Sequence, residues 1–116
     1  MGTLERASIV VVPFPYSDLS GVKLRPAIIL AAAGRKDWLL CQVTSNPYSD
    51  PDAIPITNKT LREGVLDAAV SYARPLKMFT ANESVIVKQV AILRDDKFKS
   101  LLLATIAALR KNLPKP

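Results

Sequence analysis

The apolar runs in the first half of the chain follow one another too closely for helices to connect them. A polar loop separates the first run, Ser8–Pro13, from the second, Arg25–Ala33. Only the turn Gly34–Asp37 separates the second run from the third, Trp38–Thr44. Parallel strands need a crossover connection of about a dozen residues or more, usually a helix. The spacing therefore predicts antiparallel strands joined by short connections.

The middle of the chain alternates short apolar runs with prolines and glycines, which is typical of further short strands. Ile54–Thr57 carries a proline and predicts a short edge strand, whereas Thr60–Gly64 predicts one helical turn ended by glycine. Ala68–Arg74 predicts a strand, Leu76–Thr80 a bend or short strand, and Ser84–Leu93 the last strand.

From Asp95 the apolar residues recur at helical spacing. We expect Asp95 or Asp96 to cap the helix and Pro114 to end it. Its apolar stripe, expected to pack on the sheet or on a partner chain, comprises Phe98, Leu101, Leu102, Thr105, Ile106, Leu109 and Leu113. About five or six short antiparallel strands and one closing helix predict a mainly β protein with a C-terminal helix (α+β), built as a small barrel or a strongly bent sheet.

The composition predicts one folded domain, residues 1–116, and excludes several kinds of chemistry. Hydrophobic residues make up 49% of the chain, which is typical of a folded protein. There is no histidine, and Cys41 is the one cysteine, which excludes imidazole catalysis and zinc sites of the usual ligands. We expect no metal and no cofactor. No signal peptide or membrane-spanning stretch is recognised in the sequence, which predicts a cytoplasmic protein without a membrane partner.

The net charge of +6 and the pI of about 9.7 point only weakly to nucleic acid. Through residue 96 the basic residues outnumber the acidic ones by one. The remaining excess comes from Lys97, Lys99, Arg110, Lys111 and Lys115. This distribution favours a solvated helix with a cationic C-terminal end over a dedicated binding patch.

Polar residues stand where three of the predicted strands begin or end. Arg25 begins the second strand, Thr44 and Ser45 end the third, and Arg74 ends the fifth. In a hairpin turning at Gly34–Asp37, Arg25 and Thr44 lie at the same open end. An invariably charged, planar guanidinium beside a hydroxyl suits a phosphate. The residues alone leave open that Arg25 is an ordinary surface charge and Thr44 an ordinary strand end.

Several blocks of this sequence occur in a characteristic order. Ile9–Gly21 is followed by Lys23–Ala27, which contains the Arg-Pro pair, and then by Leu40–Ser45. Ser71–Thr80, then Val87-Lys88 and the closing helix, complete the pattern. Together these blocks resemble the MazF/PemK-like toxin family of toxin–antitoxin systems, over almost the whole chain.

The resemblance implies an SH3-like β-barrel that forms a homodimer and cleaves single-stranded RNA without a metal. Arg25 and Thr44 correspond to the catalytic pair of this family. The implied reaction is attack of a 2′-hydroxyl on the adjacent phosphate, which leaves a 2′,3′-cyclic phosphate and a 5′-hydroxyl. The implied partner is a cognate antitoxin whose acidic tail occupies the RNA groove, and the implied toxin–antitoxin complex binds DNA.

The resemblance also suggests further substrate-binding residues. These are Lys23, Ser45, Arg74 and Lys77, as contacts to the RNA backbone, and Asp18, as the nearest acid to a carboxylate that some members carry in the first loop. That carboxylate position is Ser20 here, and Ala7-Ser8 replaces a Gly-Asp that often precedes the first strand. Two alternatives remain: a non-catalytic CcdB-like toxin that binds a protein, and a plain nucleic-acid-binding barrel.

Overall fold

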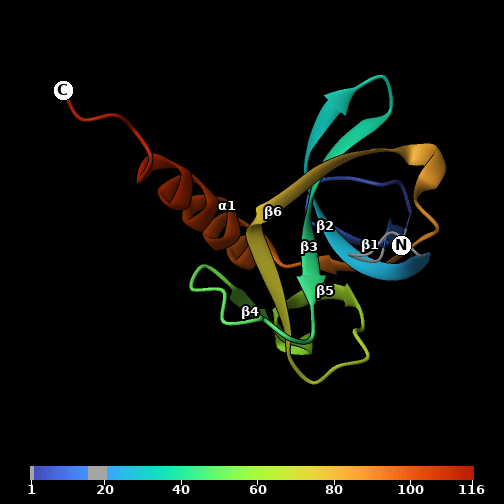
Figure 1. The fold of residues 1–116 in the computed structure, drawn as a ribbon. Coiled ribbons are helices and arrows are strands. Elements are labelled where there is room, and N and C mark those ends of the chain that lie inside the picture. The colour runs from blue at the N-terminus through green and yellow to red at the C-terminus, as the bar shows by residue number, and fades with distance from the viewer. Residues whose placement is uncertain (1, 16–20) are drawn as a thin grey trace.

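The computed structural model describes residues 2–15 and 21–116 and contains one antiparallel sheet and one C-terminal helix (Figure 1). The sheet has seven strands in the order β4-β6-β3-β2-β1-β7-β5. The strands are β1 (Ser8–Pro15), β2 (Val22–Gly34), β3 (Asp37–Thr44), β4 (Ile54–Ile56), β5 (Leu61–Gly64), β6 (Ser71–Asn82) and β7 (Lys88–Leu93), and the helix is α1 (Asp95–Arg110).

The sheet curls into a half-barrel because its long strands bend at bulges. β2 and β3 shift register between Ile29 and Ala31, and β3 and β6 shift between Cys41 and Gln42. The first shift adds one residue to β2 and the second adds three to β6, and such extra residues sharpen the local twist and bend of a strand. β4 and β5 are the two edge strands of this curved sheet, and they do not pair with each other, so the barrel stays open between them. This confirms the predicted fold class, with seven strands where about five or six were expected.

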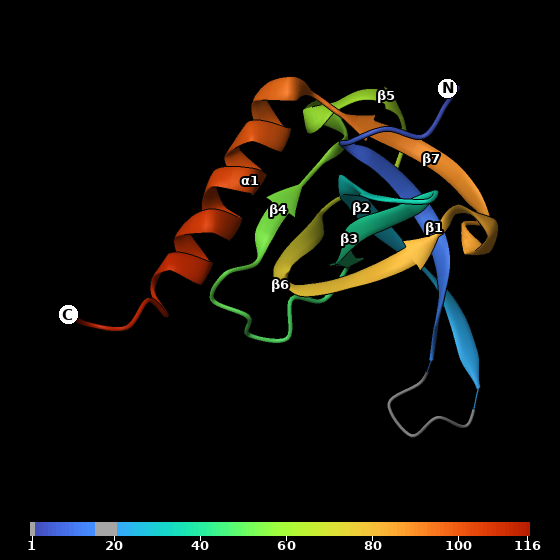
Figure 2. The same ribbon diagram turned by 90° about the horizontal axis from the view of Figure 1, so that it is seen from above.

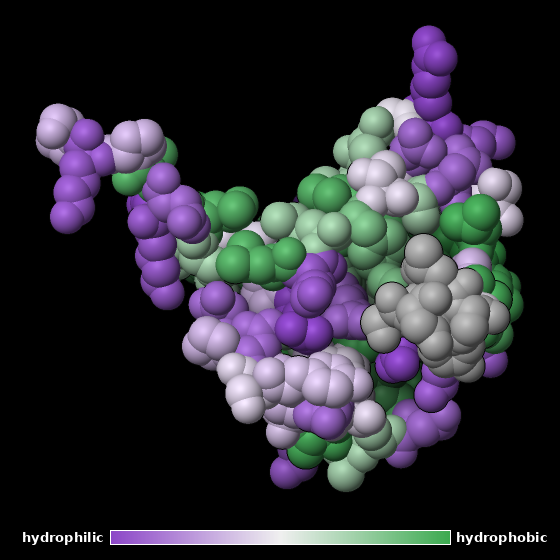
Figure 3. All heavy atoms as spheres, in the orientation of Figure 1, coloured by the Kyte–Doolittle hydropathy of each residue, from purple (hydrophilic) through white to green (hydrophobic). Residues whose placement is uncertain are grey.

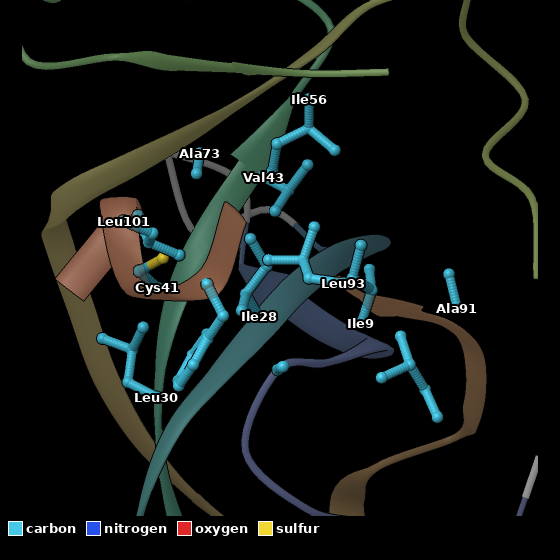
Figure 4. Packing of buried hydrophobic residues seen from close by; sticks show 13 residues of the cluster. Ile9, Ile28, Leu30, Cys41, Val43, Ile56, Ala73, Ala91, Leu93 and Leu101 are labelled. Carbon is cyan, nitrogen blue, oxygen red and sulfur yellow. The ribbon is translucent and has the colours of Figure 1, made fainter. Parts of the chain in front are cut away.

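Both faces of the central strands are buried, which explains their nearly continuous apolar sequences. Ile9, Ile28 and Cys41 face a core that also holds Leu93 and Leu101 (Figure 4). The intervening residues face a second cluster, which comprises Val10, Val12, Ala27, Ile29 and Leu40. Burying one such aliphatic side chain contributes about 1.5–3 kcal/mol, so the two clusters fix the register of β1, β2 and β3.

Helix α1 packs beside β6 (Figures 1 and 2) through one buried face, formed by Phe98, Leu101, Thr105 and Ala108. Only part of the predicted apolar stripe therefore packs on the sheet, because the side chains of Ile106 and Leu109 are 48% and 51% exposed to solvent. Figure 3 shows apolar atoms exposed along this helix. None of the helices within the described ranges is long and apolar enough to cross a membrane.

The predicted cap of this helix was wrong. Arg94 occupies the N-cap position, and its side chain makes no capping hydrogen bond. Asp96 lies within the first turn, where its Oδ1 accepts a hydrogen bond from the backbone N–H of Lys97 at 3.0 Å. The carboxylates of Asp95 and Asp96 thus stabilise the positive end of the helix from inside the first turn.

The predicted helical turn at Thr60–Gly64 was also wrong, because this segment is mostly strand. A short 3₁₀ turn covers Asn58–Thr60, and β5 then pairs with β7. Gly64 has a φ of +81°, and a Cβ there would meet the carbonyl oxygen of Val90. The glycine is therefore needed for close approach of two strands rather than for ending a helix.

Several strands differ in extent from the predicted ones. β2 begins at Val22, so Arg25 lies inside the strand, opposite Val12 of β1. β6 runs unbroken through the buried Pro75 and joins two predicted segments. The last predicted strand divides into a 3₁₀ turn, Glu83–Val85, and β7. Each extension adds ladder hydrogen bonds that local sequence patterns do not reveal.

Candidate active-site groove

A groove of about 660 Å³ opens where β2 begins and β3 ends. Its other walls come from the segment after β5, the first residue of β6 and the start of β7. The polar and charged lining residues are Lys23, Arg25, Thr44, Ser45, Asp67, Ser71, Lys88 and Gln89. The apolar part of the lining includes the exposed side chains of Leu24 and Val65.

Arg25 and Thr44 both line this groove, from neighbouring strands. The β2–β3 ladder ends at the pair Ala27 and Gln42. Arg25 and Thr44 lie two residues further along each strand, so the alternation of the strands turns both toward the same side. Arg25 is half-buried and makes no ion pair with any described residue, and Thr44 is 4% exposed.

The hydroxyl of Thr44 is held by the chain that follows it. Its Oγ1 accepts a hydrogen bond from the backbone N–H of Asn46 at 3.1 Å. In the part of the chain that the structure describes, this is the one hydrogen bond of the hydroxyl. Since a hydroxyl has one proton to donate besides its acceptor lone pairs, the O–H of Thr44 remains available to a ligand in the groove.

The groove carries a net positive charge. Lys23, Arg25 and Lys88 line it, and Asp67 is the one acidic residue among the described residues of the lining. A cleft lined mainly by one sign of charge raises the local concentration of ligands of the opposite sign. A phosphate-bearing ligand therefore suits the groove.

No protein-family model matches this sequence, and no curated protein matches it. Solved structures do match. An endoribonuclease in complex with its cognate antitoxin, from a mycobacterial species, has a TM-score of 0.69 and 15% identity, covering 98% of this chain and 100% of that one. A MazE-MazF structure from Deinococcus radiodurans has a TM-score of 0.69 and 16% identity, covering 94% and 98%. The MazF-mt6 toxin of Mycobacterium tuberculosis has a TM-score of 0.63 and 14% identity, covering 87% and 96%.

The chain has the fold of MazF toxins. The resemblance drawn from its sequence blocks is thus confirmed in the fold, over nearly the whole length of the chain. At these identities the likeness concerns the arrangement of strands and helix, and the chemistry has to be argued from the groove itself.

Sequence reasoning missed four polar residues of the groove in this MazF-like fold. Lys88 and Gln89 lie on β7, Asp67 lies in a bend after β5, and Ser71 begins β6. The pairing of β7 with β1 brings Lys88 and Gln89 to the same groove as Arg25, although they are far away in the sequence. The sequence signal that existed was the Val87-Lys88 block, which was not connected with a site.

The side chain of Gln89 is held by Ser8, the residue that stands where the sequence resemblance leads one to expect an aspartate before the first strand. Its Nε2 donates a hydrogen bond to Oγ of Ser8 at 2.7 Å, and the same oxygen accepts one from the backbone N–H of Glu5 at 3.1 Å. Ser8 is fully buried. Oε1 of Gln89 is buried and has no hydrogen-bond partner within the described ranges of the chain. Ser8 thus joins β7 to the segment before β1 at the back of the groove.

The structure places Arg74 and Lys77 outside the groove lining. Arg74 Nε donates to Oδ2 of Asp50 at 2.9 Å, and both side chains are largely buried, at 16% and 13% exposure. Its Nη1 donates to Oε1 of Gln42 at 3.2 Å. The hydrogen bond from Arg74 lowers the pKa of Asp50, against an opposing effect of desolvation. Arg74 is therefore engaged within the protein, while Lys77 is exposed.

Two other sequence predictions have different outcomes. Asp18, and with it Ser20, lies outside the described residues. Cys41 is in the core as expected, and burial raises the pKa of its thiol to about 12. A thiol of this kind is protonated and unreactive at neutral pH.

Proposed function

We propose that this chain is the toxin of a toxin–antitoxin system and that it cleaves single-stranded RNA in the groove, without a metal. One observation carries the proposal: the guanidinium of Arg25, which has no ion-pair partner among the described residues, and the hydroxyl of Thr44 line one positive groove. The fold supports it, because structures of this fold include an endoribonuclease bound to its cognate antitoxin.

The proposed reaction is a transphosphorylation within the RNA. The 2′-oxygen of one ribose forms a bond to the adjacent phosphorus, and the bond from phosphorus to the 5′-oxygen of the next nucleotide breaks. The proton of the 2′-hydroxyl goes to a base, and the 5′-oxygen takes up a proton. The products are a 2′,3′-cyclic phosphate and a 5′-hydroxyl, and no water is consumed.

In this reaction Arg25 stabilises the charge that builds on the non-bridging oxygens of the phosphate. A guanidinium keeps its charge at every relevant pH and can donate two parallel hydrogen bonds to a phosphate. Thr44 donates its O–H to the same phosphate or orients the 2′-hydroxyl. Preorganised donors of this kind are usually the largest single contribution to such catalysis.

The remaining lining residues position the RNA and move the proton. Lys23 and Lys88 bind the phosphates that flank the scissile one, and Ser45 contributes a hydroxyl. Asp67 is the one carboxylate among the described lining residues, and we assign it the acceptance of the 2′-hydroxyl proton. An arginine does not serve as this base, because its pKa is above about 12.

The partner of the proposed toxin is a cognate antitoxin. The solved structures of this fold include MazE-MazF structures, and a positive groove suits an acidic segment that competes with RNA. A homodimer is part of the proposal, because Leu103, Ile106 and Leu109 form an exposed apolar row on α1. Binding of the antitoxin complex to DNA, and a cytoplasmic location, complete the proposal.

A cleavage assay tests this function. Purified protein is incubated with a long single-stranded RNA in the presence of a chelator, and the fragment ends are identified by mass spectrometry. We expect cyclic phosphate and 5′-hydroxyl ends, with rates about 10²–10³-fold lower in Arg25→Ala and Thr44→Ala. Arg110→Ala and Thr80→Ala, which change the same residue types on exposed positions away from the groove, should cleave like the wild type.

The alternatives give different outcomes in the same experiment. Intact RNA that is still bound favours a nucleic-acid-binding barrel. Growth arrest on expression that persists in both Arg25→Ala and Thr44→Ala favours a CcdB-like toxin with a protein target. Either result contradicts the proposed ribonuclease.

A further inference from the structure

The loop after Thr44 has a conformation that its own residues do not favour. Residues 45–53 connect β3 to β4, and Tyr48 and Ser49 have φ values of +52° and +58°. Two successive non-glycine residues in the left-handed region are unfavourable. Such conformations persist only where the surrounding structure holds them. Inside the loop, the backbone N–H of Asp50 donates to the carbonyl oxygen of Pro47 at 2.9 Å and closes a turn over these two residues, and contacts from outside the loop add to this support.

Arg74 supplies this support from a rigid strand. It lies on β6, opposite Gln42 of β3, and its Nη1 donates to Oε1 of that residue. Its Nε donates to Oδ2 of Asp50 at the far end of the loop, at 2.9 Å. Its Cζ also lies 5.6 Å from the ring centroid of Tyr48. One guanidinium thus joins the sheet to Tyr48 in the strained part of the loop and to Asp50.

The loop in turn reaches the groove through Asn46. Oδ1 of Asn46 accepts a hydrogen bond from the backbone N–H of Tyr48 at 3.0 Å. The backbone N–H of Asn46 donates to Oγ1 of Thr44 at 3.1 Å. The position of this N–H decides which lone pair of the hydroxyl is used, and so where the O–H can point.

We propose that Arg74 is a positioning residue for Thr44: through Asp50 and Tyr48 it holds the loop so that the backbone N–H of Asn46 orients the Thr44 hydroxyl toward the groove. The inference rests on the proposed ribonuclease function, in which Thr44 contacts the phosphate. It gives Arg74 a role inside the protein in place of the RNA contact that the sequence suggested.

Asp50→Asn separates the two roles of Arg74, because they predict opposite effects. If Arg74 positions Thr44, loss of the carboxylate loosens the loop, and kcat falls about 10-fold while KM stays within about 2-fold. If Arg74 binds RNA, removal of the carboxylate frees the guanidinium and removes a negative charge, so KM falls and kcat does not. Asp52→Asn, the same change in the same loop at a residue that does not contact Arg74, should behave like the wild type.

Two further variants complete the test. Arg74→Lys keeps the charge and loses the planar fork, so it should also lower kcat at constant KM. Tyr48→Ala removes an exposed ring, 58% accessible, that is not part of the core, and should lower kcat less. A rise in KM without a fall in kcat in either variant contradicts the proposal.

Amide hydrogen exchange gives a readout that does not need activity. The N–H of Asn46 should exchange faster in Asp50→Asn and Arg74→Lys than in the wild type, while amides of the β2–β3 ladder keep their protection. An unchanged Asn46 amide in both variants overturns the inference. A wild-type protein that fails to cleave RNA contradicts the proposed function instead, and the exchange measurement still decides whether Arg74 controls Asn46.

Discussion

Arg25 of β2 and Thr44 of β3 lie two residues beyond the last pair of their ladder and line one groove. The guanidinium has no ion-pair partner among the described residues, and the hydroxyl has its oxygen bound and its proton free. A cation and a hydroxyl donor in one groove suit a phosphate, which is the basis of the proposed function.

The first prediction concerns the hydroxyl of Thr44. Thr44→Ser keeps the hydroxyl and should retain cleavage within about 10-fold, whereas Thr44→Val keeps the shape and should lose about 10²-fold or more in kcat/KM. Initial rates on a defined oligonucleotide measure both. Equal activity of the Ser and Val variants would mean that the side chain has only a packing role.

A second prediction concerns Lys23 and Lys88. If each binds one phosphate, Lys23→Gln and Lys88→Gln should each weaken binding of an uncleavable single-stranded RNA. Each should also reduce the slope of log K against log salt concentration by about 0.7. Titrations at several salt concentrations give the slopes. Lys99→Gln, an exposed change on α1, is the control, and a slope reduction as large in this variant would argue against phosphate contacts in the groove.

The third prediction concerns the pH dependence of stability through Asp50. Its folded-state pKa lies below the ordinary 3.8, mainly because of the hydrogen bond from Arg74. A depressed pKa gives stability that is present above the unfolded-state value and is lost as the pH falls through the folded-state value. The free energy of unfolding of the wild type should therefore exceed that of Asp50→Asn by about 1 kcal/mol at pH 7. This difference in stability should shrink below about pH 4. Urea unfolding at pH 7 and pH 3 checks this; a constant difference would contradict it.

Gly64 and Gly34 give a matched pair of substitutions for the fourth prediction. Both have positive φ, at +81° and +85°, but a Cβ at Gly64 meets β7, whereas one at Gly34 meets nothing within 4 Å. Gly34→Ala should cost about 1 kcal/mol of stability for the backbone conformation alone. Gly64→Ala should cost more than about 2 kcal/mol, because β5 must also move away from β7. Denaturant unfolding measures both, and equal losses would show that the approach of the two strands is not tight.

The first three strands were predictable because their signals are local. The turn Gly34–Asp37 and the apolar runs beside it determine a hairpin, and the hairpin alone brings Arg25 and Thr44 together. The prediction failed where distant pairing decides the outcome. Leu61–Gly64 is a strand because it pairs with β7. The local sequence around it does not predict this distant pairing.

The candidate site divides in the same way. Arg25, Thr44 and Lys23 come from one hairpin and could be named from the sequence. Lys88 enters the groove through the pairing of β7 with β1, and Asp67 through the segment after β5, which pairs with β7. Arg74 was a plausible RNA contact by its charge, but the carboxylate that engages it lies in a different loop, and sequence alone does not pair the two.

The seclusion of the one cysteine makes the protein convenient for spectroscopic labelling. The thiol of Cys41 is fully buried and its pKa is raised to about 12, so it does not react with maleimide reagents, which couple to accessible thiolates, under native conditions. A cysteine introduced at the exposed Leu113 or Val65 would therefore take up a fluorophore at a single position. The fluorescence of such a dye could then follow binding of RNA or of an antitoxin without removal of any native residue from the core.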